Sequence, residues 1–106
     1  MKQAYELSEL LPSEEKYGRV LQLRRAVSSV PANIAEGYGR FHWLENIQFC
    51  RQARGSLEET RSHIIAAADL GQVQAAQAEK VLDQAQTVRR LIDGYIRFLN
   101  RRRNES

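Results

Sequence analysis

Apolar residues recur along most of this chain at spacings of three and four, which is the period of one face of an α-helix. Four helical segments are predicted, at about 2–11, 14–38, 43–70 and 75–102. There is no sustained alternation and no Asn-Gly or Asp-Gly turn, so we expect no β-strand. The predicted fold class is all-α, an antiparallel up-down four-helix bundle with a short first helix. A three-helix bundle with a loose N-terminal arm is the nearest alternative.

The apolar stripes of the three longer segments define the expected core. They consist of Val20, Leu23, Val27, Val30 and Ile34 in the second segment, Cys50, Ala53, Leu57, Thr60, Ile64 and Ala67 in the third, and Val81, Ala85, Val88, Ile92, Tyr95 and Leu99 in the fourth. Leu91, Ile96 and Phe98 lie beside the last stripe. This additional apolar surface is typical of a helix that contacts more than one neighbour, and it predicts an interface between subunits.

Proline and glycine mark the breaks between segments. Pro12 is expected to end the first segment, with Ser13 capping the second, and Gly71 is expected just beyond the end of the third. Pro31 is unusual because it lies inside a helical segment, where proline removes one hydrogen bond and costs about 3 kcal/mol. We expect a nearby Ser, Asn or Arg side chain to bond the freed carbonyl of Val27.

Length and composition narrow the class of protein. The 106 residues are expected to form one domain, 1–106, and 42% hydrophobic and 27% charged residues are ordinary for a globular protein. Cys50 is the only cysteine, so no internal disulfide can form and a cytoplasmic location is expected. No apolar run approaches the length of a membrane span, so no membrane partner is expected.

The sequence carries none of the common patterns of a metal-binding or catalytic site. Ferritin-type sites need Glu-x-x-His, a spacing of three, on two helices. This chain has only two His, and Glu59 and His63 are spaced by four. There is no HExxH motif and no cysteine pair, and Cys50 falls on a core stripe, where a small buried thiol is usual. We therefore expect no enzymatic activity, no metal, no cofactor and no small-molecule substrate.

Polar residues follow a second face of two segments, and we call these two sets the polar strips. The first strip consists of Gln22, Arg25, Ser29, Asn33, Glu36 and Arg40, and the second of Gln52, Ser56, Glu59 and His63. Short polar side chains are poor helix formers and let backbones approach closely. We expect the two strips to form a hydrogen-bonded contact, either inside the bundle or between subunits, in which Arg25 pairs with Glu36 or Glu59.

Positive charge is concentrated late in the chain. The formal net charge is +3, and Arg90, Arg97 and Arg101 share one face at steps of seven and four, away from the core stripe. A basic helix end is typical of phosphate contact, although it also suits a solvated helix terminus. With eight aromatic residues, several of them on core stripes, stacking on bases is not expected. We predict weak, sequence-independent binding of RNA or DNA by these three arginines.

A resemblance supports this interpretation. The segment QLRRAVSSVPANIAEGYGR (22–40), with LPSEEKYG before it and ARGSLEET after it, resembles the 23S rRNA intervening-sequence proteins. The accessory variability determinant of diversity-generating retroelements is a relative that binds nucleic acid and a reverse transcriptase through a basic surface. The resemblance implies a four-helix bundle without enzymatic activity that forms closed rings, most often of five subunits. Two features depart from the family pattern: the first helix is shorter, and His42 replaces a Ser or Thr cap.

Taken together, these observations predict a non-enzymatic, ring-forming helical scaffold that acts in the cytoplasm. Its expected partners are further copies of itself, as a cyclic homopentamer, and RNA or DNA. The alternative is a protein-protein interaction adaptor with no nucleic-acid role.

Overall fold

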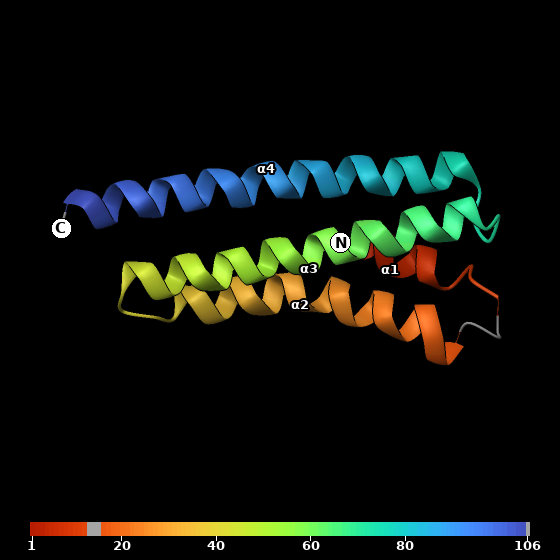
Figure 1. Ribbon diagram of the computed structural model, residues 1–106, viewed down its shortest axis with the longest axis horizontal. Coiled ribbons are helices and arrows are strands. Elements are labelled where there is room, and N and C mark those ends of the chain that lie inside the picture. The colour runs from red at the N-terminus through yellow and green to blue at the C-terminus, as the bar shows by residue number, and fades with distance from the viewer. Residues whose placement is uncertain (13–15, 106) are drawn as a thin grey trace.

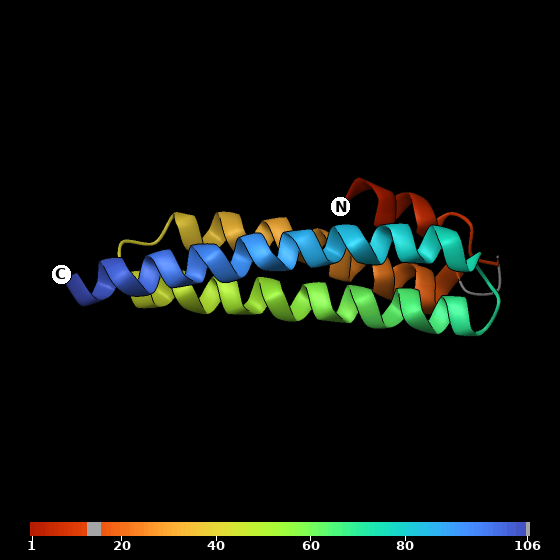
Figure 2. The same cartoon turned by 90° about the horizontal axis from the view of Figure 1, so that it is seen from above.

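The computed structural model describes residues 1–12 and 16–105. The chain forms α1 (Lys2–Ser8), a π-helical segment η2 (Lys16–Val20), α2 (Leu21–Tyr38), α3 (Trp43–Asp69) and α4 (Ala75–Glu105), and there is no strand in the described residues. Figures 1 and 2 show α3 running antiparallel to both α2 and α4, with α1 beside one half of the bundle. The prediction of an all-α four-helix bundle with a short first helix is confirmed.

The helix ends differ from the predicted ones at three places. α1 ends at Ser8, before the predicted Leu11, and α2 is preceded by the π-helical segment η2. α4 continues past Arg102 to Glu105, and the arginines in its last turn complement the negative end of the helix dipole. The predicted cap Ser13 lies outside the described residues.

The core has two halves, and α1 contributes to only one of them. In the first half, Ala4, Leu7 and Leu11 are buried against Leu23, Val27, Ile64, Ala67, Val73, Ala78 and Val81. The second half consists of Val30, Ile47, Cys50, Ala53, Leu57, Ala85, Ile92, Ile96 and Leu99. All predicted core positions of α3 are buried. Ile34, Val88 and Tyr95 are only half-buried because they lie in the half that α1 does not cover.

α1 is held to α2 by a polar contact as well as by its apolar face. The Nε of Arg24 donates a hydrogen bond to Oγ of the buried Ser8 at 2.9 Å. The same guanidinium lies over the Tyr5 ring, 4.5 Å from its centroid. Because α1 both buries core residues and makes this contact, it is a packed helix, and the alternative of a loose N-terminal arm is wrong.

The turns follow the glycine pattern of the sequence. Gly71 adopts a positive φ of 71° directly after α3, as predicted for the residue beyond a helix end. Before α3, His42 has an extended backbone and its side chain makes no capping hydrogen bond. None of the helices in the described part of the chain combines the length and apolar character that crossing a bilayer requires.

Pro31 lies on the exposed side of α2, and the helix continues through it. The hydroxyls of Ser28 and Ser29 both donate to the carbonyl of Arg25, and the Asn33 amide donates to the carbonyl of Ser29 at 2.9 Å. The side-chain donors around the proline therefore satisfy neighbouring carbonyls of the same helix, and not the carbonyl of Val27 that was predicted to need one.

Candidate functional site

The three arginines predicted to bind phosphate lie on the outward face of α4. Arg90, Arg97 and Arg101 are all exposed, on the side of the helix opposite its buried residues. Within residues 1–12 and 16–105, none of the three forms an ion pair with a carboxylate. We call this set the arginine face. Guanidinium groups in this arrangement are available to a phosphate from solution.

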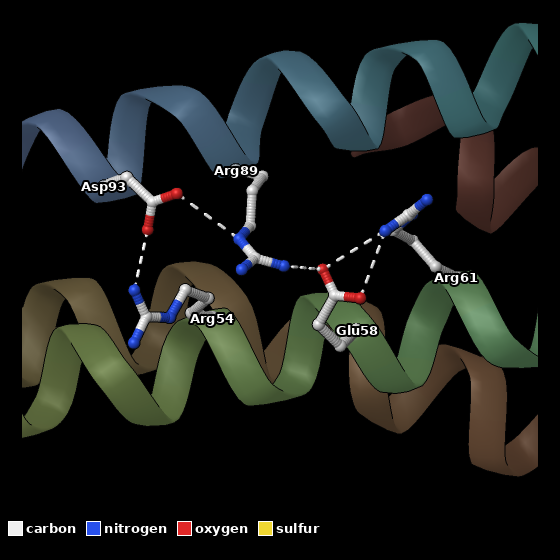
Figure 3. Close-up of polar contacts among 5 residues, drawn as sticks. All are labelled: Arg54, Glu58, Arg61, Arg89 and Asp93. Atoms are coloured by element: carbon white, nitrogen blue, oxygen red, sulfur yellow. Dashed lines mark hydrogen bonds and ion pairs between the residues drawn. The ribbon is translucent and has the colours of Figure 1, made fainter.

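A second set of charges bridges α3 and α4, and we call it the charged ladder (Figure 3). Arg54 of α3 donates to Asp93 of α4 at 2.8 Å, and Arg89 reaches back to Glu58 of α3. Arg89 also lies 3.4 Å from Asp93, and Arg61 bonds Glu58 at 3.1 Å. The ladder alternates arginines and carboxylates along the outside of the α3–α4 contact, and it contains three cations and two anions.

The ladder shifts the ionisation of its members. The hydrogen bond from Arg54 and the positive charges of Arg54 and Arg89 lower the pKa of Asp93. The hydrogen bond to Glu58 raises the pKa of Arg89. The side chains of these ion pairs remain about one third exposed, so each pair alone adds little to the stability of the fold. Because the pairs share members, they form one connected network. Since the ladder bonds α3 to α4 at two places, it constrains how α4 lies on α3 and therefore where the arginine face points.

The first polar strip lies on the outer side of α2. Gln22, Arg25 and Glu36 are exposed, while Ser29 and Asn33 are half-buried and bond within their own helix. Arg25 was expected to pair with Glu36 or Glu59, but Glu36 pairs with Arg40 at 2.7 Å. The strip therefore lies outside the bundle interior. A contact between subunits remains the prediction for it.

The second polar strip lies on the neighbouring side of α3. Ser56 is half-buried and its carbonyl accepts from Thr60, whereas Glu59 is exposed and lies 3.6 Å from the ring of His63. Arg19 of η2 contacts this strip, since its Nη1 lies 3.4 Å from His63 Nδ1. The strips thus flank the α2–α3 contact along its outside.

Cys50 is fully buried in the second half of the core. Burial raises the pKa of its thiol, which keeps it protonated and unreactive. Asn46 lies one turn earlier and bridges two helices, since its amide donates to the Tyr95 hydroxyl at 3.2 Å. In the described part of the chain, no three His, Cys, Asp or Glu side chains come together as metal ligands could.

An apolar groove runs between α2 and α4 in the half of the bundle that α1 does not cover. It is lined by Pro31, Ile34, Ala35, Tyr38, Val88, Leu91, Ile92 and Tyr95. Tyr38 is 78% exposed and Leu91 is 68% exposed. At its rim Phe98 stacks on Tyr95 with ring centroids 6.2 Å apart. The groove continues the slot that α1 fills, since Met1 contacts both halves of the core.

Residues 1–94 match the family model of the 23S rRNA-intervening sequence protein. The chain belongs to this family. The matched region includes α1, α2, α3, Arg90 and the whole charged ladder, whereas Arg97 and Arg101 lie beyond it. No curated protein matches the sequence significantly. The family assignment agrees with the resemblance carried by the segments around residues 11–18, 22–40 and 53–60.

The charged ladder is the feature that sequence reasoning missed. Two of its spacings were visible, since Arg54 and Glu58 are four apart, as are Arg89 and Asp93. Such pairs are common on solvated helix faces and do not by themselves indicate a bridge between helices. The informative signal was that both pairs lie immediately beside a core stripe, where side chains reach the neighbouring helix.

Proposed function

We propose that this protein is a non-enzymatic helical scaffold that assembles with copies of itself and binds RNA or DNA through phosphate. The observation that supports nucleic-acid binding is the arginine face: three exposed guanidinium groups on one side of α4, without carboxylate partners among the described residues. The family's description refers to an intervening sequence of 23S rRNA, which is compatible with this proposal.

The expected affinity follows from the chemistry of the arginine face. Phosphate contacts position a protein on nucleic acid without reading bases, so binding is expected to be sequence-independent. Three contacts to a duplex give a slope of about −2.7 for the logarithm of the binding constant against the logarithm of salt concentration. Binding is therefore expected to weaken about 40-fold between about 50 mM and 200 mM salt. Assembly into a ring would add such contacts through effective concentration.

The test is a fluorescence-anisotropy titration of labelled RNA and DNA at these two salt concentrations. The variant carries Arg90→Glu, Arg97→Glu and Arg101→Glu, and we expect it to lose binding. A matched control carries Lys2→Glu, Arg51→Glu and Lys80→Glu, which reverses as many exposed positive charges on other faces. If both triple variants bind equally, the arginine face is not the site. Absence of binding by the unaltered protein at the lower salt would favour the adaptor function.

Self-assembly is proposed from a separate observation, the apolar groove. Monomeric proteins rarely leave contiguous apolar surface uncovered, and two of the residues that line the groove, Tyr38 and Leu91, are largely exposed. A second copy that covers the groove by a head-to-tail contact would generate a closed ring where the rotation between successive copies closes. The family resemblance favours five subunits.

Light scattering coupled to size exclusion tests the assembly. Five copies of the 12.2 kDa chain would give about 61 kDa. Leu91→Glu should reduce this mass, because it would bury a charge in the proposed contact. Leu70→Glu is the control, since Leu70 is 63% exposed at the far end of α3. A stable monomer of the unaltered chain at about 10 µM would contradict the proposal, since an interface of standard size is expected to hold at that concentration.

A further inference from the structure

A glycine lies on the outward side of α4, at the centre of the arginine face. Gly94 follows Arg90 by four residues and precedes Arg97 by three, so these three positions share one side of the helix. The buried Ile92 and Ile96 are each two residues from Gly94, about 200° around the helix, and therefore point the other way. In Figure 1 α4 lies along the top of the bundle, with its outer side clear of α2 and α3.

The packing of the described residues does not explain a glycine at this position. Apart from the local helix backbone and the adjacent residues, the one described atom within 4 Å of a Cβ added at Gly94 is Arg97 Nη2, at 3.6 Å. This is an ordinary van der Waals distance to the end of a flexible side chain, so alanine would fit. Glycine is unfavourable in a helix interior, and Gly94 lies well inside the 31 residues of α4 without a positive φ. The bundle itself therefore gains nothing from the missing side chain.

Gly55 of α3 is a similar glycine in different surroundings. A Cβ added there would also meet nothing within 4 Å. Its exposed neighbours one turn away, Arg51 and Glu59, carry opposite charges, so they do not favour a ligand of either sign. At Gly94 the charged neighbours one turn away are both arginines of the arginine face. The open position on α4 is therefore set in a site for an anion.

We propose that Gly94 is the position at which α4 receives a phosphate of the RNA or DNA backbone, held on either side by Arg90 and Arg97. The inference rests on the proposed function and assigns the point of closest approach within the arginine face. Glycine is the residue that lets a ligand come nearest to a protein backbone. Arg97 already extends its guanidinium over Gly94, and a guanidinium can donate two parallel hydrogen bonds to one phosphate. Arg101, two turns after Gly94, is placed for a further phosphate.

Charge favours a phosphate over a second copy of the chain as the occupant. Arg90 and Arg97 form no ion pair with a described carboxylate. The carboxylates on the same side of α4 are Asp83 and Glu105, which lie about three turns before and after Gly94, and Glu105 is already paired within α4. A second copy has the same net charge of +3, and packing it here would bury guanidinium groups that lack an anion. A phosphate supplies that anion.

The experiment compares Gly94→Ala with Gly55→Ala in both stability and binding. Each variant places a methyl group where the bundle leaves room for it inside a helix, so both should raise Tm by about 2–6 °C. Binding of labelled RNA and DNA hairpins is followed by fluorescence anisotropy at about 50 mM salt, at which phosphate contacts are strong. Gly94→Ala should weaken binding about tenfold, the loss expected when one hydrogen bond to a charged group is displaced. Gly55→Ala should bind as the unaltered protein does.

A larger side chain extends the comparison. Gly94→Leu should displace the phosphate further and weaken binding more than Gly94→Ala, whereas Gly55→Leu should leave binding unchanged. Leu91 of the apolar groove lies one turn before Gly94, so the mass of each variant is measured in parallel by light scattering. A variant that is more stable than the unaltered protein but binds more weakly has lost a contact with the ligand and not its fold.

The outcomes separate this inference from the proposed function. If the protein binds the hairpins but Gly94→Ala binds them as tightly as Gly55→Ala does, the inference is overturned and the proposed function stands. If the unaltered protein binds neither hairpin, both fail. If Gly94→Ala changes the mass of the assembly, Gly94 packs between subunits and the inference is wrong.

Discussion

Replacing Gly37 by alanine tests how closely α2 and α3 approach each other. A Cβ added at Gly37 would lie 2.7 Å from Asn46 Oδ1, 2.8 Å from Phe49 Cβ and 3.1 Å from the Asn46 carbonyl oxygen. Two of these atoms are backbone or Cβ of α3 and cannot move without shifting that helix. The substitution should therefore push α2 and α3 apart at the end that carries the α2–α3 loop.

The magnitude is set by two opposing effects. Inserting a methyl group into a packed contact costs about 1–3 kcal/mol. Alanine is favoured over glycine in a helix interior by up to about 1 kcal/mol, and less near a helix end such as this one. We expect Gly37→Ala to lower the free energy of unfolding by about 1–2 kcal/mol. For a chain of this size, that lowers Tm by about 5–10 °C.

Gly55 provides the matched control. It lies inside α3 on an exposed face, and an added Cβ would meet nothing within 4 Å. Gly55→Ala should therefore gain the helix propensity alone, about 0.5–1 kcal/mol, and raise Tm. Both variants are measured by circular dichroism at one fixed protein concentration, because assembly would make Tm concentration-dependent. If Gly37→Ala is as stable as Gly55→Ala, the close approach of α2 and α3 at this point is not a constraint, and the reasoning is refuted.

Two further predictions concern buried or paired ionisable groups. The pKa of Asp93 is lowered in the folded protein, so its charge stabilises the fold above the unfolded pKa of about 3.9, and this contribution is lost as pH falls through the folded pKa. Asp93→Asn should therefore be less stable than the unaltered protein in urea unfolding at neutral pH, with the difference narrowing in acid; a difference independent of pH would contradict this. Cys50 is buried and the pKa of its thiol is raised, so it should react with Ellman's reagent only after denaturation, and rapid labelling of the native protein would show that the core at Cys50 opens.

The sequence was sufficient to predict the helices and their buried faces, because both depend on local periodicity. Leu23, Val27 and Val30 are buried as their spacing indicated, and so is the whole stripe of α3. The end of α1 was harder to place. Leu11 is buried although it lies beyond the end of α1, so its apolar character reflects the packing of the segment after the helix and not helical periodicity.

The candidate site could be predicted only in part. Periodicity placed Arg90, Arg97 and Arg101 on one outward face, and the structure agrees. It could not identify cross-helix partners, because these depend on how α3 and α4 are aligned along their axes. The lining of the apolar groove could not be predicted either, because the groove lies in the part of the bundle that α1 does not reach. Ile96 was expected to add exposed apolar surface beside the core stripe, but it is buried.

Arg89 and Arg90 show why position on the helix, and not charge alone, determines what an arginine does. They are adjacent in the sequence, and a count of basic residues treats them alike. About 100° of helical rotation separates them: Arg89 turns toward α3 and bonds Glu58, whereas Arg90 faces outward. Asp93, one turn later, accepts from both Arg54 and Arg89, so the arginine that faces α3 is paired with carboxylates, whereas those of the arginine face have no such partner among the described residues. The same helix therefore bonds the bundle through Arg89 and leaves Arg90 exposed on its outer side, which is the division of roles that the proposed binding of nucleic acid requires.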